Sequence, residues 1–159
     1  MLARIRKSME EKDEGFTLIE LLVVMIIIGI LAAIAIPVFL SQRKKAQDSA
    51  AKADVSTIGK EVATYFVDAT VVPSVTLLAS GRYQLNAAAV VGPPAVAAVT
   101  TDLGKASTNN ALGAQFFTDS TAWCVTVQNT AGDKSKSPGG YKYSAAGGLD
   151  VGVCTSSAG

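Results

Sequence analysis

A long apolar run with one carboxylate near its start constrains this chain more than any other feature. Residues 15–40 read GFTLIELLVVMIIIGILAAIAIPVFL, and Glu20 is the only charged residue among them. A helix of about 25 residues extends about 37 Å, which exceeds the hydrocarbon core of a bilayer, about 30 Å thick. The run is therefore long enough to span a membrane, and an ionised side chain inside such a segment needs a partner.

The order of residues at the start of this run is specific. Glycine, phenylalanine, threonine, leucine, isoleucine and glutamate follow one another from Gly15 to Glu20, and the apolar run continues through Gly29 and Pro37. This segment resembles the signature of type IV prepilins and related pseudopilins, and the resemblance covers about the first third of the chain. It implies that a prepilin peptidase cuts between Gly15 and Phe16 and that the new amino terminus at Phe16 is methylated.

The same resemblance implies a division of the chain and a set of partners. Residues 1–15 would be a leader peptide, 16–40 a transmembrane helix that becomes the filament core, and 41–159 an extracytoplasmic head. The expected partners are further copies of the chain in a helical filament, the prepilin peptidase, the membrane, a pilus assembly platform with its ATPase, and minor pilins. In the filament, Glu20 would pair with the amino group of Phe16 of a neighbouring subunit.

The apolar run has two other interpretations, a secretory signal peptide and a single-pass anchor. Ala33 and Ala35 form an A-x-A pattern of the kind that ends a secretory signal peptide, and a single-pass anchor would also need an apolar helix. The carboxylate inside the run and the Gly-Phe-Thr-Leu-Ile-Glu order argue against both. Basic residues flank both ends in similar numbers, so the placement of the amino terminus in the cytoplasm rests on the resemblance.

Composition excludes several classes of function. The 159 residues include 14 Lys and Arg against 13 Asp and Glu, so the formal net charge of +1 gives no basic field that would favour nucleic acid as the main partner. The sequence has no histidine, no nucleophile motif, no phosphate-binding loop and no cysteine cluster with metal spacing. We therefore expect no enzymatic activity, no catalytic residues, no metal and no cofactor.

A helix is predicted from about 16 to 69. Beyond the apolar run, hydrophobic residues recur at steps of three and four, which predicts one face packed against a sheet; they are Ala51, Val55, Ile58, Val62, Tyr65, Phe66 and Ala69. Charged residues mostly occupy the other side; they are Lys52, Asp54, Lys60, Glu61 and Asp68. Gly29 and Pro37 are weak points where a kink or a melted stretch is expected, because proline removes a backbone hydrogen bond.

The remainder of the chain predicts a small antiparallel sheet. The clearest strands are 121–128 and 141–145, and the paired glycines of 145–148 predict a hairpin turn into 149–153. The stretch 87–99 fits a loop as well as two short edge strands. The polar segments 101–110 and 131–140 are interpreted as surface loops.

Cys124 and Cys154 are the only two cysteines. Both fall in predicted strands of the part that would face an oxidising exterior, which favours a disulfide over two buried free thiols. Many pilins carry a similar carboxy-terminal region bounded by a disulfide.

The sequence thus predicts an α+β chain of the type IV pilin fold that serves as a structural subunit of a type IV pilus. The alternatives are a pseudopilin of a type II secretion or DNA-uptake system and, from a different class, a membrane-anchored binding module. The leader, the residues after Pro37 and the closing run before Cys154 most resemble pilins of Gram-positive bacteria, particularly actinobacteria. A membrane precursor and then the cell surface are the expected locations.

Overall fold

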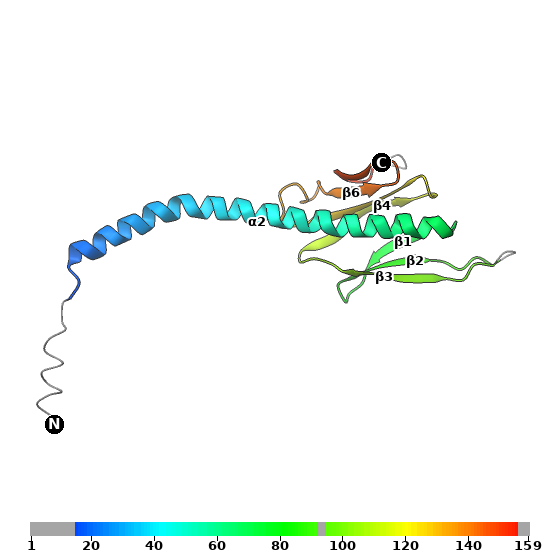
Figure 1. The fold of residues 1–159 in the computed structure, drawn as a ribbon, viewed down its shortest axis with the longest axis horizontal. Coiled ribbons are helices and arrows are strands. Elements are labelled where there is room, and N and C mark those ends of the chain that lie inside the picture. The colour runs from blue at the N-terminus through cyan, green and yellow to red at the C-terminus, as the bar shows by residue number, and fades with distance from the viewer. Residues whose placement is uncertain (1–14, 92–94, 156–159) are drawn as a thin grey trace, which may run out of the picture. The chain divides into compact units, whose positions relative to one another are not determined.

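One long helix precedes seven strands in the computed structural model, which describes residues 15–91 and 95–155 (Figure 1). The helix α2 spans Leu18–Asp68. The strands are β1 Pro73–Leu77, β2 Arg82–Ala87, β3 Val99–Lys105, β4 Asn110–Phe117, β5 Trp123–Asn129, β6 Tyr141–Ser144 and β7 Gly148–Val151. The expected helix is confirmed, with its ends within two residues of the prediction.

The chain divides into two compact units, Met1–Leu40 and Ser41–Gly159, which are described separately below. In the first unit, the part of α2 up to Leu40 is long and apolar enough to cross a membrane. The second unit, which we call the head, contains the rest of α2 and all seven strands.

The head holds two antiparallel sheets where the sequence predicted one. The first has the strand order β1-β2-β3 and the second β4-β5-β6-β7. The side chain of Gln115 in β4 joins them, because its amide accepts a hydrogen bond from the N–H of Val75 and donates one to the carbonyl of Val75 in β1. At this point the two sheets are joined by hydrogen bonds from a side chain to the backbone, and not by backbone hydrogen bonds between paired strands.

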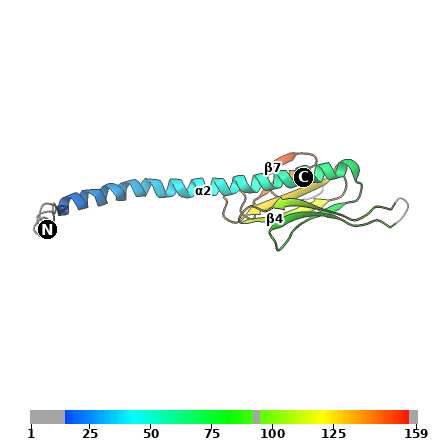
Figure 2. The same cartoon turned by 60° about the horizontal axis from the view of Figure 1, so that its bottom comes forward.

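The hydrophobic stripe of α2 forms the centre of the core. Ala51, Val55, Ile58 and Val62 are fully buried, as the spacing of three and four predicted. They belong to one cluster with apolar residues of both sheets, namely Val75, Tyr83, Leu85, Leu103, Trp123, Val125, Val127 and Tyr141. Figures 1 and 2 show the head part of α2 running along the strands that it covers.

Strand β5 is buried on both faces and carries the disulfide. Trp123, Val125 and Val127 belong to the core under α2. Cys124 and Thr126 alternate with them: Cys124 is bonded to Cys154 with a Cα–Cα distance of 5.9 Å, and the Thr126 hydroxyl contacts the sulfur of Cys154. The predicted disulfide and the β6–β7 hairpin are confirmed.

One predicted loop is wrong. The sequence predicts a surface loop at 101–110, but β3 runs to Lys105 and pairs with β2, and β4 begins at Asn110. Leu103 lies in the core, while the three residues before it, Thr100, Thr101 and Asp102, are exposed. A single buried residue among polar neighbours gives too little alternation to mark a strand.

The other two irregular segments agree with the prediction. Within 87–99, one isolated bridge joins Val90 and Val96, and residues 92–94 lie outside the described residues. The segment 131–140 forms no strand.

Candidate assembly site

The residues before the long helix are exposed and not helical. Gly15, Phe16 and Thr17 precede the first turn of α2, and 86 % of the Phe16 surface is exposed. Among the described residues other than its neighbours, none has an atom within 4 Å of the place where a Cβ of Gly15 would stand. A peptide bond in such a segment is sterically open to a protease. The rest of the expected leader, residues 1–14, lies outside the described residues.

Glu20 and Thr17 cap the amino end of α2 reciprocally. The N–H of Thr17 donates to Oε2 of Glu20 at 2.8 Å, and the Thr17 hydroxyl donates to the same oxygen at 2.7 Å. In return, the N–H of Glu20 donates to the hydroxyl oxygen of Thr17 at 3.3 Å. This is a capping box, which satisfies two of the backbone N–H groups that a helix start leaves free.

The sequence predicts a cation as the partner of Glu20, whereas its partner within the chain is Thr17. The signal was present, because Thr-x-x-Glu before an apolar run is a recognised helix-start pattern. Within the described residues, Glu20 has no ion-pair partner. Its carboxylate thus has a role inside a single chain, while the expected pairing with a neighbouring amino group stays a prediction.

The part of α2 that follows is apolar on every side. All its large hydrophobic side chains from Leu18 to Leu40 are exposed, with exposed fractions between 46 % and 82 %. A helix that is hydrophobic all round is stable only when lipid or other protein surrounds it. This segment therefore needs a membrane or partner helices.

Gly29 and Pro37 both lie within α2, and the helix continues through both residues. The expected kink or melting at these two residues stays a prediction.

In the head, Asp48 holds a loop to the helix. Its carboxylate accepts hydrogen bonds from the N–H groups of Asp133, Lys134 and Ser135 at 3.0–3.1 Å and from the Ser135 hydroxyl at 2.6 Å. Asp48 is 8 % exposed and Ser135 fully buried. Burial alone would raise the pKa of Asp48, but the hydrogen bonds from Ser135, Lys134 and Asp133 outweigh it and lower the pKa.

Asp54 connects α2 to both sheets. Its carboxylate accepts hydrogen bonds from the Tyr83 hydroxyl of β2, from the N–H and hydroxyl of Ser107, and from the side-chain amide of Asn110 in β4. The assignment of Asp54 to the solvent side of the helix was therefore wrong. Burial and the adjacent Asp54 carboxylate raise the pKa of Tyr83.

Comparison with known proteins agrees with this geometry at the amino end. Residues 12–36 match the family model "Prokaryotic N-terminal methylation motif". The chain is 40 % identical over 63 residues to the type II secretion system core protein G of Pseudomonas aeruginosa, covering 40 % of this chain and 44 % of that protein. It is 44 % identical over 55 residues to the type IV major pilin protein PilA of Myxococcus xanthus, covering 35 % and 25 %.

A further relative is the type IV wide pilus major component PilA4 of Thermus thermophilus, 47 % identical over 55 residues that cover 35 % of this chain and 42 % of that protein. The chain thus aligns with less than half the length of each of these curated relatives. No solved structure matches. The similarities support a prepilin-like protein.

Proposed function

We propose that this chain is a structural subunit of a type IV pilus, assembled through its amino-terminal helix. One observation carries the proposal: a capped, wholly exposed apolar helix begins directly after an accessible Gly15–Phe16 bond, within a segment that matches the N-terminal methylation motif. Such a helix suits a membrane before assembly and a bundle of like helices afterwards. Relatives named as pilins support the structural, non-enzymatic role.

Processing is the first step of the proposed mechanism. The chain is inserted as a precursor with its amino terminus in the cytoplasm, and a prepilin peptidase cuts between Gly15 and Phe16. Residues 1–15 leave as a leader, and Phe16 is methylated. The segment 16–40 then anchors a head, 41–159, on the other side of the membrane.

Assembly is the second step. Extraction from lipid brings no large hydrophobic gain, so association between helices depends on packing at small residues and on polar pairs. Cleavage places a new cation at Phe16, next to Thr17, and an ionised Glu20 inside an apolar bundle needs such a partner. We propose that the Phe16 amino group of one subunit pairs with Glu20 of the next and sets the register between them.

A second candidate is a pseudopilin of a secretion or DNA-uptake system. The observation that favours it is the similarity to type II secretion system core protein G from several bacteria. Processing and helix packing would be the same, but the fibre would stay short. The pilin proposal also includes three finer expectations. They are a Gram-positive host, an assembly platform with its ATPase, and minor pilins.

Mass spectrometry of the amino-terminal peptide, from material sheared off the cell surface and from membranes, tests both candidates. We expect an N-methylated Phe16 in the sheared material. A processed form confined to membranes would favour the pseudopilin. An intact Met1 in both fractions would contradict both candidates and leave a simple anchor.

A further inference from the structure

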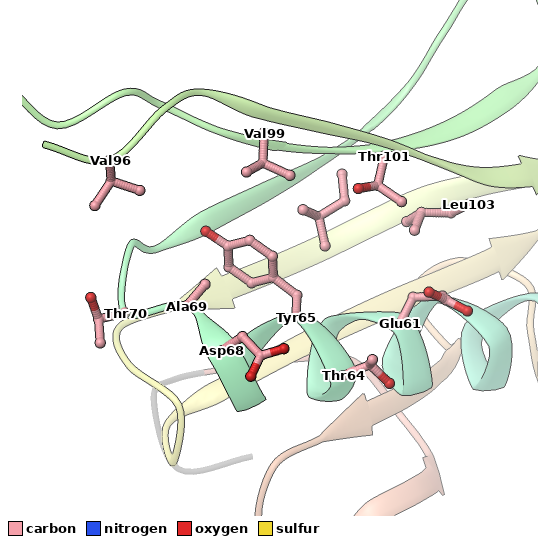
Figure 3. A pocket seen from close by; sticks show the side chains of 11 residues that line it. Glu61, Thr64, Tyr65, Asp68, Ala69, Thr70, Val96, Val99, Thr101 and Leu103 are labelled. Carbon is pink, nitrogen blue, oxygen red and sulfur yellow. The ribbon is translucent and has the colours of Figure 1, made fainter.

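A groove lies beside the far end of the head helix, between α2 and the first sheet (Figure 3). Its volume is about 520 Å³. The ring of Tyr65 and the side chains of Leu85 and Val99 give it an apolar lining, and the carboxylates of Glu61 and Asp68 stand on the helix at its rim. Both carboxylates are exposed and form no ion pair with any described residue.

A basic pocket lies beside the near end of the same helix. It measures about 320 Å³ and contains Lys45, Lys52 and Lys134. The acidic residues of this pocket are Asp48, which is turned toward the 133–135 loop, and Asp133. The three lysines are exposed and form no ion pair within the described part of the chain.

The two charged pairs on α2 have the same spacing. Lys45 and Lys52 are seven residues apart, and so are Glu61 and Asp68, which places each pair on one face about 10 Å apart along the axis. Each acidic residue follows its basic counterpart by sixteen residues, or about 24 Å of helix. At about 100° per residue, the acidic and basic faces lie about 160° apart around the helix.

This arrangement fits a contact between two parallel copies of the helix. When one copy is shifted by sixteen residues along its axis, Lys45 meets Glu61 and Lys52 meets Asp68 in the same register. Because the two faces are nearly opposite, each copy can offer its basic face to one neighbour and its acidic face to another. Such a head-to-tail contact uses two different surfaces and continues into an open fibre.

We propose that the groove of Glu61 and Asp68 receives Lys45 and Lys52 of a second copy of this chain, so that neighbouring heads are held about sixteen helical residues apart. The inference rests on the proposed filament and adds a register between heads to the contacts between the amino-terminal helices. Lysine suits the groove chemically, because its hydrocarbon stem can cover partly exposed apolar side chains such as Val99, while its ammonium reaches a carboxylate or the face of Tyr65.

Charge reversal in the full-length chain, expressed in its own cells, tests the pairing. We expect Lys45→Glu with Lys52→Glu to reduce sheared fibre by about tenfold, since like charges then face each other at every repeat. Adding Glu61→Lys and Asp68→Lys to the same chain should restore it. The matched control is Lys60→Glu with Lys136→Glu, the same charge change outside both pockets, which should leave fibre yield unchanged.

Cross-linking tests the register itself. Fibres carrying Lys52→Cys and Asp68→Cys, treated with a short thiol-specific bifunctional reagent, should give a ladder of covalent oligomers. Within one chain these positions are about 24 Å apart on the helix, so a short reagent joins only different copies. A chain with Lys45→Cys and Asp68→Cys, shifted by a further seven residues, should give no ladder.

The outcomes are distinguishable from those of the filament proposal. Normal fibre with the doubly reversed lysines, or a ladder only from the mismatched cysteines, would overturn the register and leave the filament intact. Loss of fibre without recovery in the fourfold variant would also overturn it, provided that membranes hold normal amounts of oxidised chain. Absence of fibre from the unaltered chain would overturn both proposals.

Discussion

Three carboxylates on α2 have different structural roles. Glu20 caps the helix start, Asp48 holds a loop, and Asp54 joins the two sheets. Each carboxylate accepts several hydrogen bonds from N–H or O–H groups, which makes its removal costlier than the loss of one surface charge.

Substitutions at Glu20 can separate its capping role from its charge. Glu20→Gln keeps an oxygen that can accept from Thr17, whereas Glu20→Ala removes the cap as well. We expect both variants to be cleaved normally and both to lose most fibre, because the proposed pairing with Phe16 needs the negative charge. Immunoblots of processed chain and quantitation of sheared fibre provide the measurements. Normal fibre from Glu20→Gln would show that capping suffices.

Asp48→Asn should destabilise the head by about 1–3 kcal/mol at pH 7, because the amide offers one acceptor oxygen where the carboxylate offers two to the 133–135 loop. The pKa of Asp48 is lowered in the folded chain, so its contribution is complete above the ordinary aspartate range near pH 4 and is lost as the pH falls through the lowered value. Denaturant unfolding of the full chain in detergent should therefore show a difference that shrinks at about pH 3. An equal difference at both pH values would contradict this.

The sequence predicts the positions of residues that recur at a regular spacing. It does not predict the roles of residues whose partners are distant in the sequence. The stripe from Ala51 to Val62 was found because its spacing is local. Asp48 and Asp54 were missed because their partners lie between 29 and 87 residues away in the sequence, and a polar residue beside a hydrophobic stripe looks like a solvent-facing one. The Thr17 cap was local and could have been found.

At the scale of elements, α2 comes very close to β6. Gly59 lies against the ring of Tyr143, and a Cβ at that position would overlap the ring atoms. Tyr143 is in turn stacked on Trp123 of β5, with ring centroids 5.9 Å apart. The absence of a side chain at this one helical position sets how near the second sheet can lie.

Gly59→Ala should destabilise the head by about 1–3 kcal/mol, because the ring of Tyr143 must move and the core is already filled. Thermal unfolding of the full chain in detergent measures the effect. Gly29→Ala is the control, since nothing lies within 4 Å of its added Cβ and alanine favours a helix. An unchanged midpoint for Gly59→Ala would contradict the close packing.

The disulfide ties β5 to the segment after β7 across a sequence separation of 30 residues. Replacing Cys124 and Cys154 together by serine should cost roughly 3–4 kcal/mol of unfolding free energy in the chain-entropy model. Denaturant unfolding with and without reductant measures it. Reductant should lower the denaturant midpoint of the native chain and leave that of the double variant unchanged. If it lowered both midpoints, the lost stability would not come from the disulfide.

At the scale of the whole molecule, the chain combines a helix long and apolar enough to cross a membrane with a head that has its own buried core. The two parts were predictable to different degrees. The amino-terminal segment was identified from contiguous residues, whereas the two sheets and the Gln115 link between them depend on pairings that no local pattern encodes.

Assembly through the proposed head contacts should depend on salt. Exposed ion pairs are screened beyond about 8 Å at physiological ionic strength and beyond about 3 Å at 1 M. Light scattering should therefore show isolated fibres softening or shortening as sodium chloride is raised, and the charge-restored fourfold variant should respond alike. Fibres with the same length distribution at all salt concentrations would contradict an electrostatic register.

The two carboxylates that anchor the head helix, buried Asp48 and half-buried Asp54, also have a mechanical consequence. Asp48 accepts hydrogen bonds from the loop that leads into β6, and Asp54 accepts hydrogen bonds from β2, Ser107 and β4. A pull along the head part of α2 would therefore be transmitted through both sets of hydrogen bonds, in addition to the packed core. In the proposed fibre under tension, the helix would carry the force along its axis. Asp48 and Asp54 would be two of the points at which that force passes to the loop and to the sheets.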